Sequence, residues 1–333
     1  MIQGDSRRRF KETCCDSKHA KTCLYVDINP EVLLSEADLT IDQITLKFSH
    51  TIPPRGRVYQ TEAGDEAIIS RNYQTGSIIG TLKTHDGRSF ALEKCNDSYI
   101  FQQFNVASFP TDEVIDEGDF DPTLIVAPDT RSGSGYTYSI MFYYTAEFAA
   151  ATPNIEDFID QVIAETNQGY VNSRIPITAT KLCQELATVP DQTDARALLR
   201  EFKHMKGTVS ELRNTADAAA LLSVDISHCG MAYMATATSG NTLSVTKKSC
   251  ALGYYSFGHE VAHNLGASHN KEVTTNNNFD DGHAHLIESG AASIGYRTIL
   301  GYYADGHDMR VNYYSNPAVT HPITGTPTGV EGT

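Results

Sequence analysis

The segment from His259 to His269 constrains this chain more than any other part of its sequence. It reads HEVAHNLGASH. His259 and His263 are four residues apart, so on a helix both imidazoles lie on one face and reach a single metal ion. Gly266 can adopt a positive φ, which ends the helix and turns the chain back so that His269 supplies a third ligand. The spacing therefore predicts a helix over 256–265 and a zinc site made by three histidines.

Glu260 follows the first histidine directly, which places its carboxylate beside a metal-bound water but outside the ligand set. Three protein ligands leave one coordination position open, as hydrolytic zinc sites require. A carboxylate at this place takes a proton from the water and returns it to the leaving amine. The pattern indicates a hydrolase that cuts peptide bonds, with Zn²⁺ as cofactor, Glu260 as the catalytic general base, and proteins or peptides as substrates.

The charge and hydropathy of the chain restrict its partners. There are 26 Lys and Arg against 41 Asp and Glu, which gives a formal net charge of −15. An acidic surface disfavours nucleic acid and anionic membranes, so we expect no nucleic-acid partner. No apolar run approaches the roughly 18 residues that a membrane-spanning helix needs, so we expect no membrane span.

The two halves of the 333-residue chain have different patterns, which predicts two domains. Residues 24–118 contain short runs of alternating polar and apolar residues, which predict a small β-rich domain. Residues 136–333 contain both strand-like and helix-like segments, which predict an α/β domain. We interpret residues 1–23 as an N-terminal tail and residues 119–135, rich in Gly and Ser near their end, as a linker.

The region from about Gly135 to Gly329 resembles the metzincin zinc metalloproteases, and within them the reprolysin-like (adamalysin-type) group. The resemblance rests on the HExxHxxGxxH motif and on segments before and after it. It implies an α/β metzincin catalytic domain, with a mixed twisted sheet, helices and zinc in a cleft, preceded by a small β-rich prodomain. It also implies a secreted, extracellular metalloendopeptidase.

The resemblance extends to the walls of the substrate cleft. Gly230, Met231 and Ala232 stand where this group has its edge strand, so they are expected to line the cleft, where a substrate would add as an extended strand. Tyr314 stands in the segment that forms the wall of the pocket for the substrate side chain after the cut. It favours an apolar side chain there.

The resemblance also implies a Cys229–Cys250 disulfide and a turn beneath the zinc. Leu300 stands where the group has a methionine that packs under the metal without binding it, and leucine is a volume-conserving replacement. Tyr302 is either a contact to zinc or to the transition state, as in some relatives, or a packed core tyrosine. The pairing of the other five of the seven cysteines stays open.

Cys95 lies in the β-rich half that resembles a prodomain. A thiolate is a good zinc ligand, so Cys95 could fill the open coordination position and make the chain a zymogen inhibited by its own prodomain. Arg131, in the linker, would then be a plausible processing site. The alternative is a structural Cys95, either buried or paired with an N-terminal cysteine.

A second functional class is a catalytically silent binding protein built on a protease fold. Such a protein typically loses the general base or a metal ligand. Here Glu260 and all three histidines are present, which favours the enzyme.

Overall fold

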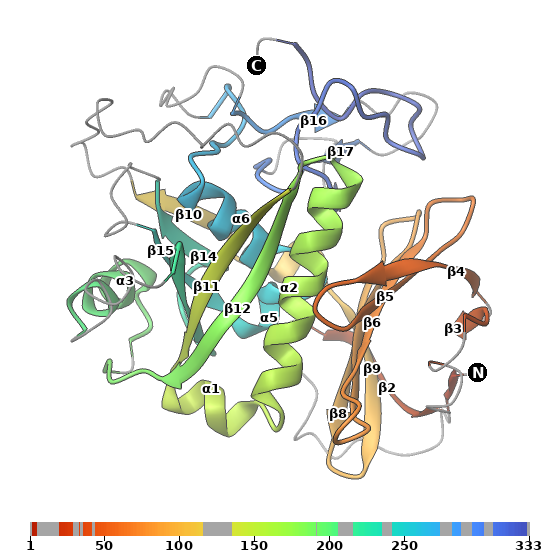
Figure 1. The fold of residues 1–333 in the computed structure, drawn as a ribbon, viewed down its shortest axis with the longest axis horizontal. Coiled ribbons are helices and arrows are strands. Elements are labelled where there is room, and N and C mark those ends of the chain that lie inside the picture. Colours follow the sequence, from red (N-terminus) through yellow and green to blue (C-terminus); the bar gives the residue numbers. More distant parts are fainter. Residues whose placement is uncertain are drawn as a thin grey trace.

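The computed structural model describes residues 2–4, 20–28, 33, 36–41, 44–115, 135–190, 192–205, 216–234, 242–273, 282–287, 295–302 and 309–331. These residues form a closed β-barrel, a six-stranded sheet and a three-stranded sheet, joined by helices. The barrel and the six-stranded sheet lie on opposite sides of one long helix, α2 (Ile155–Asn172) (Figure 1).

The barrel is antiparallel except where β1 meets β3, and its order is β1-β2-β9-β8-β7-β6-β5-β4-β3. Its interior is filled by large apolar side chains, among them Leu46, Tyr59 and Phe101. Its strands are β1 (Ile2–Gly4), β2 (Ala20–Ile28), β3 (Leu39–Ile41), β4 (Ile44–Ile52), β5 (Gly56–Gln60), β6 (Glu66–Arg71), β7 (Ile78–Lys83), β8 (Ser89–Cys95) and β9 (Ser98–Phe104). The β-rich first half predicted from the sequence is therefore present in the structure.

Residues 2–4 and 20–23, the described part of the N-terminal segment, belong to this barrel, so the prediction of a tail is wrong for these residues. β1 pairs with β2 in antiparallel register, with Ile2 opposite Ile28, and β2 pairs in turn with β9. Cys23 and Val26 on β2 are buried. The two strands close the barrel, which removes the free sheet edge that a barrel starting later in the chain would expose.

The six-stranded sheet has the order β10-β14-β15-β13-β11-β12. Four of its strands run parallel, whereas β14 is antiparallel to β15, so the sheet is mixed as predicted. The linker predicted over 119–135 lies outside the described residues apart from Gly135. The strands are β10 (Asp112–Ile115), β11 (Tyr136–Tyr144), β12 (Ile177–Leu186), β13 (Ala218–Ser223), β14 (Gly230–Tyr233) and β15 (Leu243–Lys247).

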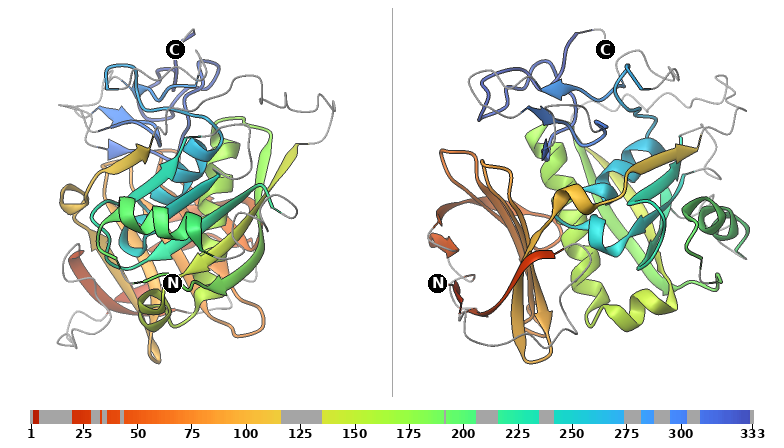
Figure 2. Two further views of the ribbon diagram at one scale, coloured as in Figure 1. Left: turned by 90° about the vertical axis from the view of Figure 1, so that its left-hand side faces the viewer. Right: turned by 180° about the vertical axis from the view of Figure 1, so that it is seen from behind.

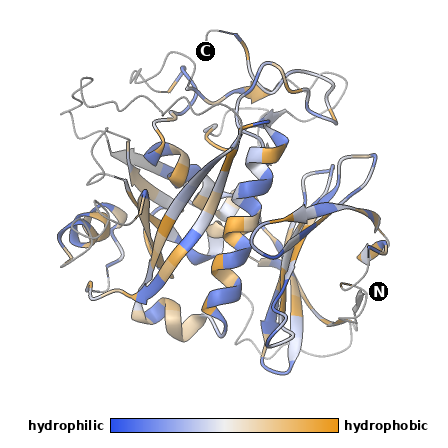
Figure 3. Ribbon diagram, viewed as in Figure 1, coloured by the Kyte–Doolittle hydropathy of each residue, from blue (hydrophilic) through white to orange (hydrophobic). Residues whose placement is uncertain are grey.

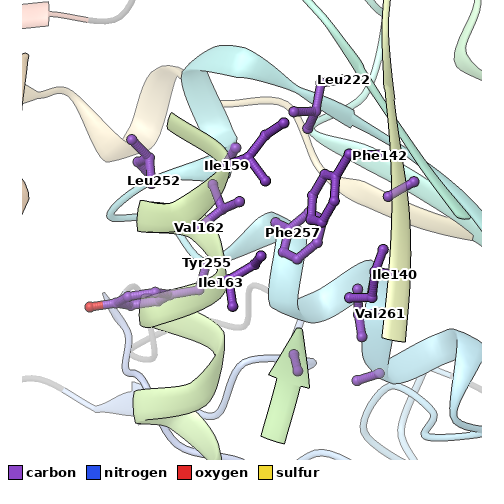
Figure 4. Packing of buried hydrophobic residues seen from close by; sticks show 14 of the residues in the cluster. Ile140, Phe142, Ile159, Val162, Ile163, Leu222, Leu252, Tyr255, Phe257 and Val261 are labelled. Atoms are coloured by element: carbon purple, nitrogen blue, oxygen red, sulfur yellow. The ribbon is translucent and has the colours of Figure 1, made fainter. Parts of the chain in front are cut away.

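Helices cover both faces of this sheet because successive strand residues point to opposite faces. On one face, α2 and α6 (Ser256–Asn264) pack together, and Phe257 of α6 stacks on Phe142 of β11 with ring centroids 5.3 Å apart (Figure 4). On the other face, Phe202 of α3 (Ala195–His204) packs edge-on against Tyr143. Two short helices, α1 (Ala146–Ala151) and α5 (Lys248–Ala251), complete the layers.

Two further segments complete the fold, one between the barrel and the mixed sheet and one near the C-terminus. After the barrel it forms the 3-10 turn η2 (Val106–Ser108) and then joins the edge of the mixed sheet as β10 (Figure 2). Near the C-terminus it forms the three-stranded sheet of β16 (Leu286–Ile287), β17 (Tyr296–Arg297) and β18 (Met309–Arg310). Among the described residues, no helix combines the length and the apolar character needed to cross a membrane.

The face of α2 that meets the barrel carries buried polar side chains, so polar and apolar residues alternate along this helix (Figure 3). Asn72 of the barrel donates a 2.7 Å hydrogen bond to Asp157, and Gln161 donates one of 2.9 Å to the carbonyl of Ile68. Glu165 is buried at the same interface. It accepts hydrogen bonds from the hydroxyl of Thr81 and from the backbone N–H of Gly253.

Glu165 makes the stability of this interface depend on pH. Burial raises the pKa of Glu165 from 4.5 to about 8, so the folded protein keeps a proton that the unfolded chain releases above pH 4.5. Stability therefore falls as pH rises through this window, by at most about 1.4 kcal/mol per pH unit for one group. Burial lowers the pKa of Lys83 to about 7, which opposes the fall only above pH 7.

We predict that Glu165→Gln flattens the decrease in melting temperature between pH 5 and pH 7, because glutamine has no proton to release. Differential scanning calorimetry of the intact chain measures this. Glu156→Gln, at the half-exposed start of the same helix, is the control and should retain the wild-type slope. Equal slopes for wild type and Glu165→Gln would contradict the assignment.

Candidate metal centre and its cleft

Three histidines meet at the C-terminal end of α6. The helix presents His259 and His263 on one face, and Gly266, with φ of 94°, turns the chain so that His269 comes back toward them. Their Nε2 atoms lie 3.0 Å (259–263), 3.0 Å (263–269) and 3.1 Å (259–269) apart. The sequence-predicted ligand set is thus brought together, and all three side chains are buried.

Hydrogen bonds fix the tautomers of His259 and His263, so that both rings direct a lone pair into the cluster. Nδ1 of His259 donates to the carbonyl of Ile299 (2.8 Å), and Nδ1 of His263 donates to the carbonyl of Ala267 (2.7 Å). In a neutral imidazole the other nitrogen, Nε2, then carries only a lone pair. Burial lowers the pKa of His263 to about 4 and that of His259 well below its usual value, which keeps both rings neutral.

Lone pairs that face each other at 3.0 Å repel unless a cation lies between them. The triangle of Nε2 atoms is small enough to leave a point about 2.0–2.1 Å from each corner, which is the usual Zn–N distance. The carbonyls that fix the two ring orientations are the outer-shell partners that metal-bound histidines usually have. The residues present therefore fit a divalent metal with three nitrogen ligands.

Glu260 lies next to this cluster with a fully buried side chain. Within the described part of the chain, neither of its carboxylate oxygens has a hydrogen-bond partner. Burial first, and the nearby carboxylate of Asp112 second, raise the pKa of Glu260 well above its usual value. Gly230 makes room for this side chain, because a Cβ there would lie 2.3 Å from Oε1 of Glu260.

The turn that contains Leu300 packs against the helix that carries the first two histidines. Leu300 is buried in the same core cluster as Phe257 and Val261 of α6. Its neighbour Ile299 supplies the carbonyl that holds His259. Leu300 therefore belongs to the apolar core that supports α6.

Tyr302 lies at the mouth of the cluster. Its ring centroid is 3.8 Å from that of His269, and its backbone N–H donates to Oδ1 of Asn270 (3.0 Å). The hydroxyl donates to the backbone carbonyl of Asp112 at 2.8 Å. In this structure Tyr302 thus binds the segment that follows the barrel, which neither of the two sequence interpretations anticipated.

The predicted edge strand is present, but its edge is already occupied. β10 pairs with β14 in parallel register, with Asp112 opposite Gly230 and Val114 opposite Ala232. The carbonyl of Thr111 also accepts a 2.9 Å hydrogen bond from the N–H of Cys229. Gly230, Met231 and Ala232 therefore lie one strand in from the edge, because the chain's own residues 112–115 form the outermost strand.

The predicted Cys229–Cys250 disulfide is present, with Cα atoms 5.4 Å apart. It ties the start of β14 to α5, just before the metal-binding helix. Cys250 is fully buried, and Tyr254 packs against the disulfide. The link therefore fixes the cleft edge relative to the helix that carries the histidines.

Two predicted site residues have other roles. Cys95 is disulfide-bonded and is buried with Cys23 and Ile100 in the barrel, so it offers no thiolate, and its prediction as the latency ligand is wrong. Tyr314 is buried, stacks on Tyr170 at 5.2 Å and donates its hydroxyl to the carbonyl of Gly258 (3.1 Å). It supports α6 from below, so it does not give the cleft an apolar wall.

Two charged residues that the sequence analysis did not select complete the site. Arg310 of β18 is fully buried, and its Nη2 donates to Oδ2 of Asp112 at 2.6 Å. Its Nη1 donates to the carbonyl of Tyr254 (3.1 Å), and the guanidinium lies 4.5 Å from the centre of the Tyr254 ring. The only signals in the sequence were an arginine shortly before the predicted pocket wall and an aspartate at the start of an acidic stretch.

We predict that zinc stabilises this protein through His269. At a free zinc concentration 100 times Kd, binding should raise the melting temperature by roughly 5–10 °C. His269→Ala should abolish most of this shift, measured by thermal unfolding before and after zinc is added to chelator-treated protein. His321→Ala removes a buried histidine outside the cluster and should keep the shift. A full shift in His269→Ala would contradict the ligand assignment.

Gly230→Ala should impair catalysis without removing the metal, because its methyl group must displace the Glu260 carboxylate. A misplacement of about 1 Å at a catalytic group can cost about 10²-fold in rate. We expect a fall in kcat/KM of this order with unchanged zinc content by atomic absorption. Wild-type activity in the variant would show that Glu260 needs no such space.

The comparisons with known proteins agree with this geometry. The family model described as Metallo-peptidase family M12 matches residues 134–315, which is more than half of the chain. A peptidyl-Asp metalloendopeptidase from Stenotrophomonas maltophilia (strain K279a) is 27% identical over 285 residues, which cover 81% of this chain and 67% of the relative. One from Xanthomonas campestris pv. campestris is 28% identical over 280 residues, covering 80% of this chain and 65% of the relative.

Among solved structures, metalloproteinase-II from Bacteroides fragilis is 12% identical and overlaps 83% of this chain and 86% of its own, with a TM-score of 0.45. That likeness is too distant to support an inference. The match of the family model covers the histidine cluster, Glu260 and the mixed sheet from β11 onward. The chain therefore belongs to metallo-peptidase family M12.

Proposed function

We propose that this chain is a secreted zinc endopeptidase made as a latent zymogen, which cuts proteins at aspartate residues. The observation that carries the proposal is the position of β10. A strand from the segment before the catalytic half lies along β14, beside the histidine cluster and Glu260. A chain segment in that place has the position that an extended substrate would need.

The chemistry follows from the residues of the cluster. When bound, zinc polarises the scissile carbonyl and eases the loss of a proton from water. Glu260, in a buried place that raises its pKa, can hold that proton and return it to the leaving amine. Its carboxylate is free for this role because no described residue binds it.

Latency is supported by the contacts that residues 111–115 make along the cleft. They bind the cleft by the β10–β14 pairing, the Thr111–Cys229 contact, the Tyr302 hydrogen bond and the Asp112–Arg310 ion pair. A substrate strand needs the same edge, so this segment must leave before cleavage. This replaces Cys95 with a strand as the inhibitory element of the prodomain.

Aspartate specificity is supported by the name peptidyl-Asp metalloendopeptidase, which the relatives from Stenotrophomonas maltophilia and Xanthomonas campestris both bear. Secretion is supported by the disulfide of Cys229 and Cys250 and by the disulfide-bonded states of Cys23 and Cys95. Disulfides persist in oxidising compartments, as outside the cell.

The proposal predicts that the intact chain is inactive and that a cut between residues 116 and 134, for instance after Arg131, activates it. Cleavage of a denatured protein with zinc present measures this. The clipped Glu260→Gln variant keeps the shape of the side chain and should lose at least about 10²-fold in rate. If clipped wild type and clipped Glu260→Gln both fail to cut while binding zinc, the chain is a silent protease-fold binding protein.

A further inference from the structure

We propose that Arg310 selects an acidic side chain in the substrate, and that Asp112 occupies this same subsite in the intact chain. The inference rests on the proposed peptidase function and names the residue behind its specificity. The ion pair between Asp112 and Arg310 then has two roles. It holds the inhibitory segment in the cleft, and it resembles the contact that an acidic substrate side chain would make with Arg310.

Arg310 and Asp112 form a buried pair of opposite charges. The Arg310 side chain is 2% exposed and the Asp112 side chain 0%, and their atoms are 2.6 Å apart. Among the described residues, Asp112 is the only acid that forms an ion pair with Arg310. A buried guanidinium without a counter-ion is strongly disfavoured. When residues 112–115 leave the cleft, Arg310 therefore keeps its charge and loses its anion.

The ion pair lies beside the metal-binding histidines and the general base. The Asp112 oxygen that contacts Arg310 lies 3.9 Å from Nδ1 of His259, and donor atoms of Asp112, His259 and Glu260 lie within 4.8 Å of one another. Asp112 also holds its backbone against Tyr302 and opposite Gly230. A substrate residue bound by Arg310 in the same way has its backbone beside the general base. The subsite therefore lies next to His259 and Glu260.

Arg297, the neighbour of Arg310 in the three-stranded sheet, is buried too but donates its hydrogen bonds to neutral groups. Arg297 lies opposite Arg310 in the β17–β18 pairing and is also buried. Its guanidinium donates to the carbonyl of Gly301 (2.8 Å) and to the hydroxyl of Tyr254 (2.9 Å). Both contacts are to neutral groups of the C-terminal half. Arg297 thus has a packing role, and its replacement is a matched control for loss of a buried arginine.

The first arm of the test measures specificity. Two quenched fluorescent peptides differ only by Asp or Asn at one position, and they are cut by clipped wild type, Arg310→Gln, Arg310→Lys and Arg297→Gln. We expect clipped wild type to prefer Asp, and Arg310→Gln to lose roughly 10²-fold in kcat/KM for the Asp peptide with little change for Asn. Arg310→Lys should keep part of the preference, because it retains the charge without the planar fork.

Arg297→Gln should retain the ratio of the two kcat/KM values even where it lowers the melting temperature. An Arg310→Gln enzyme that still prefers Asp would overturn the inference and leave the proposed function intact. A wild-type enzyme that cuts both peptides equally would overturn the inference and the proposed aspartate specificity, but not the zinc-endopeptidase assignment. A clipped wild type that cuts neither peptide, nor denatured protein, would instead defeat the proposed function.

The second arm needs no catalysis, so it tests even in that case whether the ion pair of Asp112 and Arg310 holds the segment in the cleft. Hydrogen exchange of the intact chain in a Glu260→Gln background reports protection of the amides of residues 112–115. Asp112→Asn and Arg310→Gln should each increase exchange there by about 10-fold or more, and the double variant should add little, because both remove one interaction. Unchanged protection in both single variants would show that the pair does not hold the segment, and would overturn the inference.

Discussion

The site depends on three imidazole lone pairs that the fold directs at one point. Nε2 atoms 3.0–3.1 Å apart, on rings kept neutral by burial, are unfavourable neighbours unless a cation joins them. The protein imposes this geometry with a helix, a glycine that ends it, and two backbone carbonyls that orient the rings. The hydrophobic core around α6, with Phe257 and Val261, keeps the helix in place. A bound cation would offset the electrostatic repulsion between the converging lone pairs.

A second buried charge, the guanidinium of Arg310, is neutralised by a residue from a distant part of the chain. Arg310 comes from the C-terminal sheet, whereas its counter-ion Asp112 comes from the strand that follows the barrel. Buried hydrogen bonds of α2, such as that from Gln161 to a backbone carbonyl of β6, hold the barrel in place. Ala164 of the same helix also packs in an apolar cluster with barrel residues. The same chain thus covers the edge of its own cleft with residues 112–115. These features connect the fold to the latency and the substrate choice that we propose.

The sequence predicted the parts of this protein that local patterns specify. The spacing of His259, His263 and Gly266 predicted the helix and its end, and the resemblance supplied the disulfide and the edge strand. What it could not predict depends on tertiary placement. Strand β10 has no local signal for its partner, since parallel pairing with β14 joins residues more than a hundred positions apart. Cys95 was misread because a cysteine's partner, not its neighbours in sequence, decides its role.

The most direct test is zinc-edge anomalous diffraction from crystals of the intact Glu260→Gln chain grown with zinc. The account predicts one strong peak within bonding distance of Nε2 of His259, His263 and His269, with residues 112–115 on the edge of β14 and Asp112 against Arg310. A peak at other residues, or an intact chain with an uncovered β14, would contradict it.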